Sequence, residues 1–138
     1  MDSPKVKEFL GIDVGEARIG IARGNSAARL AEPLKTIEAF QAEVELERLI
    51  KENSVSALVI GLPRGLDGSE TDQTQVVRNW AKSIQTKISL PFYWQDEALT
   101  SHRAESSKQN KTVGNDAVAA AIILQDFLDG PESDRVAV

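Results

Sequence analysis

Apolar runs separated by turn-forming residues organise the first third of the chain. Residues 6–13 contain the apolar residues Val6, Phe9, Leu10 and Ile12 and end at an aspartate, and residues 18–23 form a second apolar run after Gly15. Two such runs joined by a short turn predict an antiparallel β-hairpin. Residues 30–37 predict a third strand, which Pro33 restricts to a sheet edge or a bulge because proline cannot donate a backbone hydrogen bond.

Helical and strand patterns alternate through the rest of the chain. Apolar residues recur at three- and four-residue spacing over residues 41–53, 71–87 and 116–128, which predicts three helices. Continuous apolar runs predict buried strands over residues 55–60 and 91–95, and a turn-rich loop over residues 61–70 follows the first of them. We therefore expect an α/β fold with a mixed central sheet, an N-terminal antiparallel hairpin and helices on both faces.

Composition narrows the class of protein and of any metal site. A length of 138 residues with 41% hydrophobic content predicts one domain, expected over residues 1–129. We expect a disordered C-terminal tail over residues 130–138. The sequence has no cysteine and one histidine, so thiolate sites are excluded and an imidazole-rich zinc site is disfavoured. A bound metal would have oxygen ligands, which favours Mg²⁺ or Mn²⁺.

Charge and hydropathy indicate the cellular compartment and the class of partner. The net charge of -5 argues against a protein that coats nucleic acid, so any contact with phosphates would depend on local basic clusters. The sequence shows neither a signal peptide nor a run of transmembrane length. We expect a cytoplasmic protein without membrane association.

Three carboxylates at the ends of apolar segments are the candidate catalytic and metal-binding residues. Asp13 ends the first predicted strand, Glu97 follows the strand at residues 91–95, and Asp116 opens the last helix. Two strand ends and a helix start can converge in space, and converging carboxylates repel each other unless a cation lies among them. The pattern therefore indicates a divalent-metal site.

Each of the three acids also has an ordinary structural explanation. Asp13 is flanked on its own strand face by Gly11 and Gly15, which would leave room for a polynucleotide backbone, but an aspartate before glycine also starts turns. Glu97 could be a solvated strand end. Asp116 could be the N-cap of an alanine-rich helix, and capping and metal ligation can coexist. The sequence alone leaves these alternatives open.

Basic residues in two regions are candidates for phosphate contact. The glycine-rich loop over residues 61–70 offers backbone N–H groups and Arg64, although it is not a Walker loop and could equally be a double turn. Other basic residues flank the proposed acidic cluster. The candidate substrate-binding residues are Arg18, Arg64, His102, Arg103, Lys108 and Lys111.

Several motifs in the same order resemble the YqgF/RuvX family over nearly the whole chain. They are Leu10-Gly-Ile-Asp-Val-Gly15 with Arg18-Ile-Gly-Ile-Ala22, Val59-Ile-Gly-Leu-Pro63 with Asp67-Gly-Ser-Glu70, Asp96-Glu97 with Leu99-Thr-Ser101, and Asp116-Ala-Val-Ala-Ala120 with Ile123-Leu-Gln125. The resemblance implies an RNase H-like fold, a role as a pre-16S rRNA nuclease or Holliday-junction-resolvase homologue, and Asp13, Glu97 and Asp116 as the catalytic acids.

The chain departs from the family pattern in two places. Ala98 stands where the family usually has arginine after the glutamate, and the segment over residues 101–116 is shorter and less basic than is typical. Both departures concern the grip on the substrate and not the metal ligands. Arg103 is a candidate replacement for the missing guanidinium.

The function expected from residues and resemblance together is metal-dependent hydrolysis of phosphodiester bonds, with processing of the pre-16S rRNA 5′ end as the leading substrate. A resolvase-like nuclease acting on branched DNA and a non-catalytic nucleic-acid-binding module are the alternatives. A sugar-kinase or actin-like phosphate site is disfavoured, because those folds close two domains around ATP. We expect nucleic acid as the partner and a monomer or homodimer as the assembly.

Overall fold

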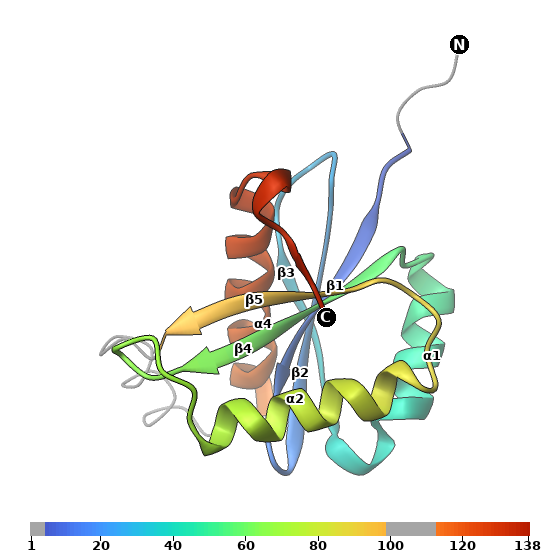
Figure 1. Ribbon diagram of the computed structural model, residues 1–138. Helices are drawn as coiled ribbons and strands as arrows, with labels where there is room; N and C mark the ends of the chain where they lie inside the picture. The colour runs from blue at the N-terminus through green and yellow to red at the C-terminus, as the bar shows by residue number, and fades with distance from the viewer. Residues whose placement is uncertain (1–4, 99–112) are drawn as a thin grey trace.

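The computed structural model describes residues 5–98 and 113–138, which form one six-stranded sheet with helices on both faces (Figure 1). In chain order the elements are β1 (Glu8–Val14), β2 (Arg18–Asn25), β3 (Glu32–Glu38), η1 (Ala39–Gln41), α1 (Ala42–Asn53), β4 (Ala57–Arg64), α2 (Asp72–Gln85), β5 (Phe92–Ala98), α4 (Val113–Asp129), η2 (Glu132–Asp134) and β6 (Val136–Ala137).

The sheet is mixed, with the strand order β3-β2-β1-β4-β5-β6. Strands β1, β2 and β3 form an antiparallel meander, β1, β4 and β5 run parallel, and β6 pairs antiparallel with β5. The N-terminal hairpin and the mixed sheet are therefore confirmed. Pro33 lies on the edge strand β3, where its missing N–H removes no bond from a central strand.

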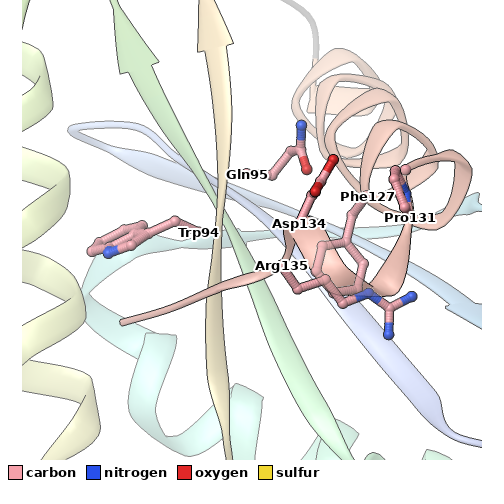
Figure 2. A pocket seen from close by; sticks show the side chains of 7 residues that line it. Trp94, Gln95, Phe127, Pro131, Asp134 and Arg135 are labelled. Atoms are coloured by element: carbon pink, nitrogen blue, oxygen red, sulfur yellow. The ribbon is translucent and has the colours of Figure 1, made fainter.

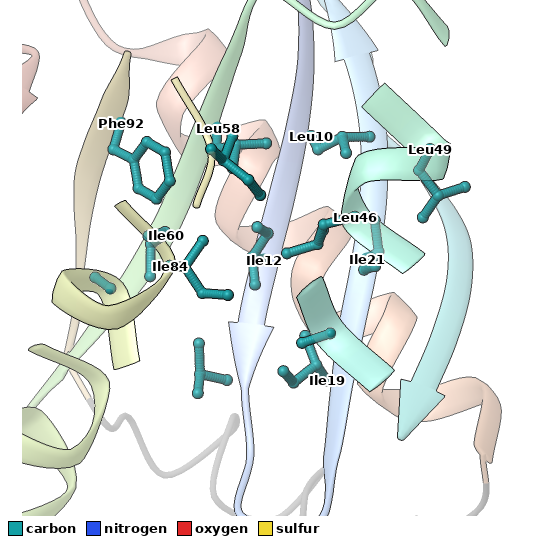
Figure 3. Packing of buried hydrophobic residues seen from close by; sticks show 14 of the residues in the cluster. Leu10, Ile12, Ile19, Ile21, Leu46, Leu49, Leu58, Ile60, Ile84 and Phe92 are labelled. Carbon is teal, nitrogen blue, oxygen red and sulfur yellow. The ribbon is translucent and has the colours of Figure 1, made fainter. Parts of the chain in front are cut away.

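One face of the sheet packs against α1 and α2. Leu10 and Ile12 of β1 alternate with residues of the opposite face and join Leu58 and Ile60 of β4 in this core (Figure 3). Leu46 of α1 is fully buried against them. The apolar face predicted for the first helix thus covers the sheet as expected.

Among the described helices, α4 is the one that packs against the opposite face (Figure 1). Phe9 and Val59 from the sheet contact a row of apolar side chains that recur at helical spacing on α4, namely Ala120, Ile123, Leu124, Phe127 and Leu128. Because Asp13 and Phe9 lie an even number of residues apart on β1, the Asp13 side chain belongs to this α4 face.

Two elements extend beyond their predicted limits. β4 continues to Arg64, into the stretch predicted as a loop, because Gly61 to Arg64 pair with residues from Gln95 to Ala98 on β5. α4 begins at Val113, so Asp116 lies within its first turn and is not its N-cap. The positive end of the helix dipole still favours a carboxylate there.

The prediction of a disordered tail differs from the structure at residues 130–138. Val136 and Trp94 are register partners in the β5–β6 pair, and the Val138 N–H donates to the Phe92 carbonyl over 3.0 Å. The Arg135 guanidinium stacks on the Phe127 ring, 4.3 Å from its centroid. The open edge of β5 offers hydrogen-bond partners that the tail sequence alone cannot reveal.

Within residues 5–98 and 113–138, no helix has both the length and the apolar character to cross a membrane.

Candidate functional site

The contact between Gly20 and the start of α4 brings Asp116 beside Asp13. Gly20 on β2 is the register partner of Asp13 on β1, and directly opposed residues of an antiparallel pair point to the same face. A Cβ atom built on Gly20 would lie only 1.8 Å from the Asp116 carbonyl oxygen. The first turn of α4 therefore rests on the backbone of the residue opposite Asp13, which it can reach because Gly20 has no side chain.

An ion pair links this helix start to the hairpin. Arg18 Nε lies 3.3 Å from Asp116 Oδ2, and the two side chains are 35% and 31% exposed. Arg18 and Gly20 are two residues apart on β2, so both face α4. The guanidinium thus supplies a positive charge among the candidate acids.

Glu97 occupies the same face of the sheet, farther along and two strands away. It follows Tyr93 by four residues on β5, and Tyr93 packs in the α4 core. Its register partner is Pro63 on β4, and the side chain is buried, with 9% exposure. Because β4 lies between β1 and β5, the backbones of Asp13 and Glu97 are at least two strand spacings apart, roughly 10 Å.

The three acids thus share one face without forming a ready-made metal centre. In the described part of the chain, no three His, Cys, Asp or Glu side chains are gathered closely enough to hold an ion. The donor chemistry fits a hard divalent cation, since carboxylate oxygens are the ligands that Mg²⁺ and Mn²⁺ prefer. The three carboxylates are therefore suitable ligands in kind, but the described residues do not gather them around one point.

The space expected beside Asp13 is largely filled. A Cβ on Gly11 would lie 2.6 Å from the Leu124 Cβ and 2.9 Å from the Ala120 carbonyl oxygen. Gly11 therefore seats α4 and leaves no opening for a polynucleotide backbone, contrary to the expectation from the sequence. The missing side chain serves close packing of helix on sheet.

Arg64 lies on the other face of the sheet. Its Nε is 3.3 Å from Asp96 Oδ1 and its Nη1 is 3.5 Å from Glu70 Oε2. It follows the core residue Leu62 by two positions on β4, which places it on the α2 side and away from Asp13. Asp96 and its neighbour Glu97 thus face opposite sides, as alternation predicts.

The loop after β4 is stabilised by its own hydrogen bonds. Asp67 accepts a hydrogen bond from the Ser69 N–H over 3.0 Å, and hydrogen bonds from the Ser69 side chain and backbone lower the pKa of Asp67. Arg78 donates two 2.9 Å hydrogen bonds to Glu70, which lower the pKa of Glu70. These contacts support the Asp67-Gly68 half of the predicted double turn, whereas its Pro63-Arg64 half lies in β4.

The remaining basic candidates lie outside the described residues. These are His102, Arg103, Lys108 and Lys111. Their segment connects Glu97 to the helix that carries Asp116, so it begins and ends at candidate acids.

A small pocket lies at the opposite end of α4 (Figure 2). It is lined by Trp94, Gln95, Phe127, Gly130, Pro131, Asp134 and Arg135. Phe127 is eleven residues from Asp116, or roughly 16 Å along the helix. The pocket is therefore separate from the acidic face.

Sequence reasoning missed two contributors to the site. Gly20 was not singled out, although a glycine directly across a hairpin from the candidate aspartate was a visible signal. The pairing of Arg18 with Asp116 had no local signal, because it depends on the docking of α4.

Comparison with known sequences identifies the family. Residues 7–130 match the model of RuvX, described as Holliday junction resolvase. A protein of Chloroflexus aurantiacus named "Putative pre-16S rRNA nuclease" is 40% identical over 136 residues, covering 91% of this chain and 89% of that protein. One of the same name from Crocosphaera subtropica is 43% identical over 131 residues, covering 87% and 91%.

Comparison with solved structures identifies the fold. The structure described as T. thermophilus RuvC in complex with Holliday junction substrate superimposes with a TM-score of 0.58 at 12% identity, covering 96% of this chain and 99% of that one. The fold is thus the RNase H-like fold that the motifs implied. From the match over residues 7–130 and the identity to these relatives, the chain belongs to the RuvX family.

Proposed function

We propose that this protein is an endonuclease that hydrolyses phosphodiester bonds in structured nucleic acid, and that it processes the 5′ end of pre-16S rRNA. The observation that carries the proposal is the shared sheet face of Asp13 and Glu97, on which the first turn of α4 sets Asp116. The names of the relatives support rRNA as the substrate.

The proposed cofactor is Mg²⁺ or Mn²⁺, with Asp13, Glu97 and Asp116 as its ligands. When bound, such an ion supplies a Lewis acid that activates water and neutralises charge on the phosphate. The fold holds the three carboxylates in position. Asp13 is held by the pairing of β1 with β2, and Asp116 is held by the packing of α4 on Gly20. Glu97 is withdrawn from bulk water, which strengthens its attraction to a cation.

Substrate binding is assigned to the basic residues predicted from the sequence. We expect phosphate contacts from Arg18, His102, Arg103, Lys108 and Lys111. Arg64 belongs to the same set from its sequence context, but it would first have to leave the carboxylates of Asp96 and Glu70.

Two other functions have an observation in their favour. The description of the family model and the junction bound by the RuvC neighbour favour branched DNA as a substrate. The lack of three closely gathered acids among the described residues favours a non-catalytic nucleic-acid-binding module.

A cleavage assay distinguishes the three. A precursor rRNA fragment and a four-way DNA junction are each incubated with Mn²⁺ and with wild type, Asp13→Asn or Asp126→Asn. Asp126 is the matched control, because it is an exposed acid near the far end of α4. We expect the rRNA fragment to be cut by wild type and Asp126→Asn, with at least a hundredfold loss in Asp13→Asn. Cleavage of the junction alone would favour the resolvase, and binding without cleavage would favour the module.

A further inference from the structure

The Arg18–Asp116 ion pair places a side-chain cation where the proposed function needs a metal ligand. Asp116 Oδ2 is inaccessible to solvent and accepts no hydrogen bond from the described residues, although Arg18 Nε lies 3.3 Å away. The contact is therefore an attraction between charges without a well-aligned hydrogen bond. A carboxylate held in this way remains open to a stronger cation.

We propose that Arg18 is a positioning residue that holds the Asp116 carboxylate while no nucleic acid is bound, and releases it to a divalent cation when the guanidinium transfers to a phosphate group. This inference rests on the proposed function. One of the three proposed ligands is thus paired with the chain's own cation in this structure.

The exposure of Arg18 and the weakness of its ion pair with Asp116 allow the guanidinium to move from the carboxylate to a phosphate. Arg18 is 35% exposed, so its guanidinium can meet a phosphate without local unfolding. Ion pairs at this level of exposure contribute little to stability, so a phosphate contact can replace the one with Asp116 at small cost. Arg18 also lies on β2 directly beside the strand of Asp13, so a phosphate bound by Arg18 would lie next to the acidic face.

The proposal predicts competition between Arg18 and metal for one carboxylate. Mn²⁺ binding to the protein without nucleic acid is measured from the electron paramagnetic resonance signal of unbound Mn²⁺. Arg18→Gln removes the competing cation, so we expect it to bind Mn²⁺ about three- to fivefold more tightly than wild type. Arg18→Lys keeps the charge and should stay near wild type.

A second strand position and a double variant separate competition from general electrostatics. Arg23 also lies on β2 and pairs with Glu8 and Glu32, so Arg23→Gln removes the same charge away from Asp116 and should leave Mn²⁺ affinity unchanged. In an Asp116→Asn background, Arg18→Gln should no longer tighten binding, because the carboxylate for which they compete is gone.

Sulfate, as a soluble phosphate analogue, tests the transfer step. It should tighten Mn²⁺ binding to wild type and leave Arg18→Gln unchanged, because only wild type has a guanidinium to draw away. Three results would each overturn the proposal. They are a wild-type Mn²⁺ affinity in Arg18→Gln, a rise in Mn²⁺ affinity from Arg18→Gln that persists in the Asp116→Asn background, and no effect of sulfate on Mn²⁺ binding to wild type. Absence of Mn²⁺ binding by every variant at millimolar concentration would overturn the proposed metal-dependent function as well.

Discussion

Among the described glycines, Gly20 is the one at which the sheet and the last helix approach most closely. An added methyl group would overlap the Asp116 carbonyl oxygen at 1.8 Å and the Ala117 nitrogen at 2.8 Å, and both are backbone atoms that cannot rotate away. We therefore expect Gly20→Ala to lower the free energy of unfolding by about 2–3 kcal/mol, measured by urea denaturation. The displaced helix start should also abolish any Mn²⁺-induced rise in melting temperature.

Gly130→Ala is the control for this substitution. It follows α4, and an added Cβ would meet its nearest atoms at 3.5 Å and 3.7 Å, which are ordinary contact distances. Its stability should therefore match wild type within about 0.5 kcal/mol. If Gly20→Ala unfolds at the same urea concentration as Gly130→Ala, α4 does not rest on Gly20 as described.

At the scale of single residues, strand alternation could be predicted and long-range partners could not. Placing Asp13 opposite the core residues of β1, and Glu97 opposite Asp96, needed only the two-residue period of a strand. The pairing of Arg18 with Asp116 and the burial of Gly11 under Leu124 depend on how α4 docks. No local pattern encodes that docking geometry.

At the scale of elements, the turn after β4 is fastened to α2 by the Glu70–Arg78 pair. Two hydrogen bonds from Arg78 lower the pKa of Glu70, so this contact stabilises the fold when the carboxylate is charged. The stabilisation is fully present above the ordinary glutamate pKa of 4.5 and is lost as the pH falls through the lower folded value.

An NMR titration of the side-chain carboxyl carbons checks this contact. In Arg78→Gln the pKa of Glu70 should rise towards 4.5, while that of Asp67, which is lowered by Ser69, should stay where it is in wild type. Equal movement of both values would indicate a general change in the loop. An unmoved Glu70 would show that the pair does not form in solution.

Element types could be predicted better than element ends. The three helices and the hairpin follow from apolar spacing, but β4 runs on to Arg64 because β5 supplies backbone partners along that stretch. The end of a strand depends on its neighbour in the sheet, and β5 is distant in sequence. The same reason explains β6, which exists only because the edge of β5 is available.

At the scale of the whole molecule, the two faces of the sheet have different tasks. The face under α1 and α2 carries most of the apolar core, whereas the α4 face combines a smaller core with all three candidate acids. The core of the α4 face ends at Phe127 and Leu128, next to the C-terminal segment. That segment therefore closes both the edge of the sheet and the end of the α4 core.

Removing residues 131–138 should expose the β5 edge of the sheet and the end of the α4 core together. Loss of the Arg135 contacts with Phe127 and Phe9 should lower the free energy of unfolding by about 1–2 kcal/mol, and the uncovered β5 edge should promote self-association. Urea denaturation and sedimentation velocity measure the two effects.

The variant Arg135→Gln separates the two effects, because it removes the ring contacts and keeps β6. It should lose stability and remain in the wild-type assembly state. If the truncated chain matches wild type in both measurements, the segment does not close the sheet in solution. If Arg135→Gln also self-associates, the Arg135 contacts are what hold β6 against β5.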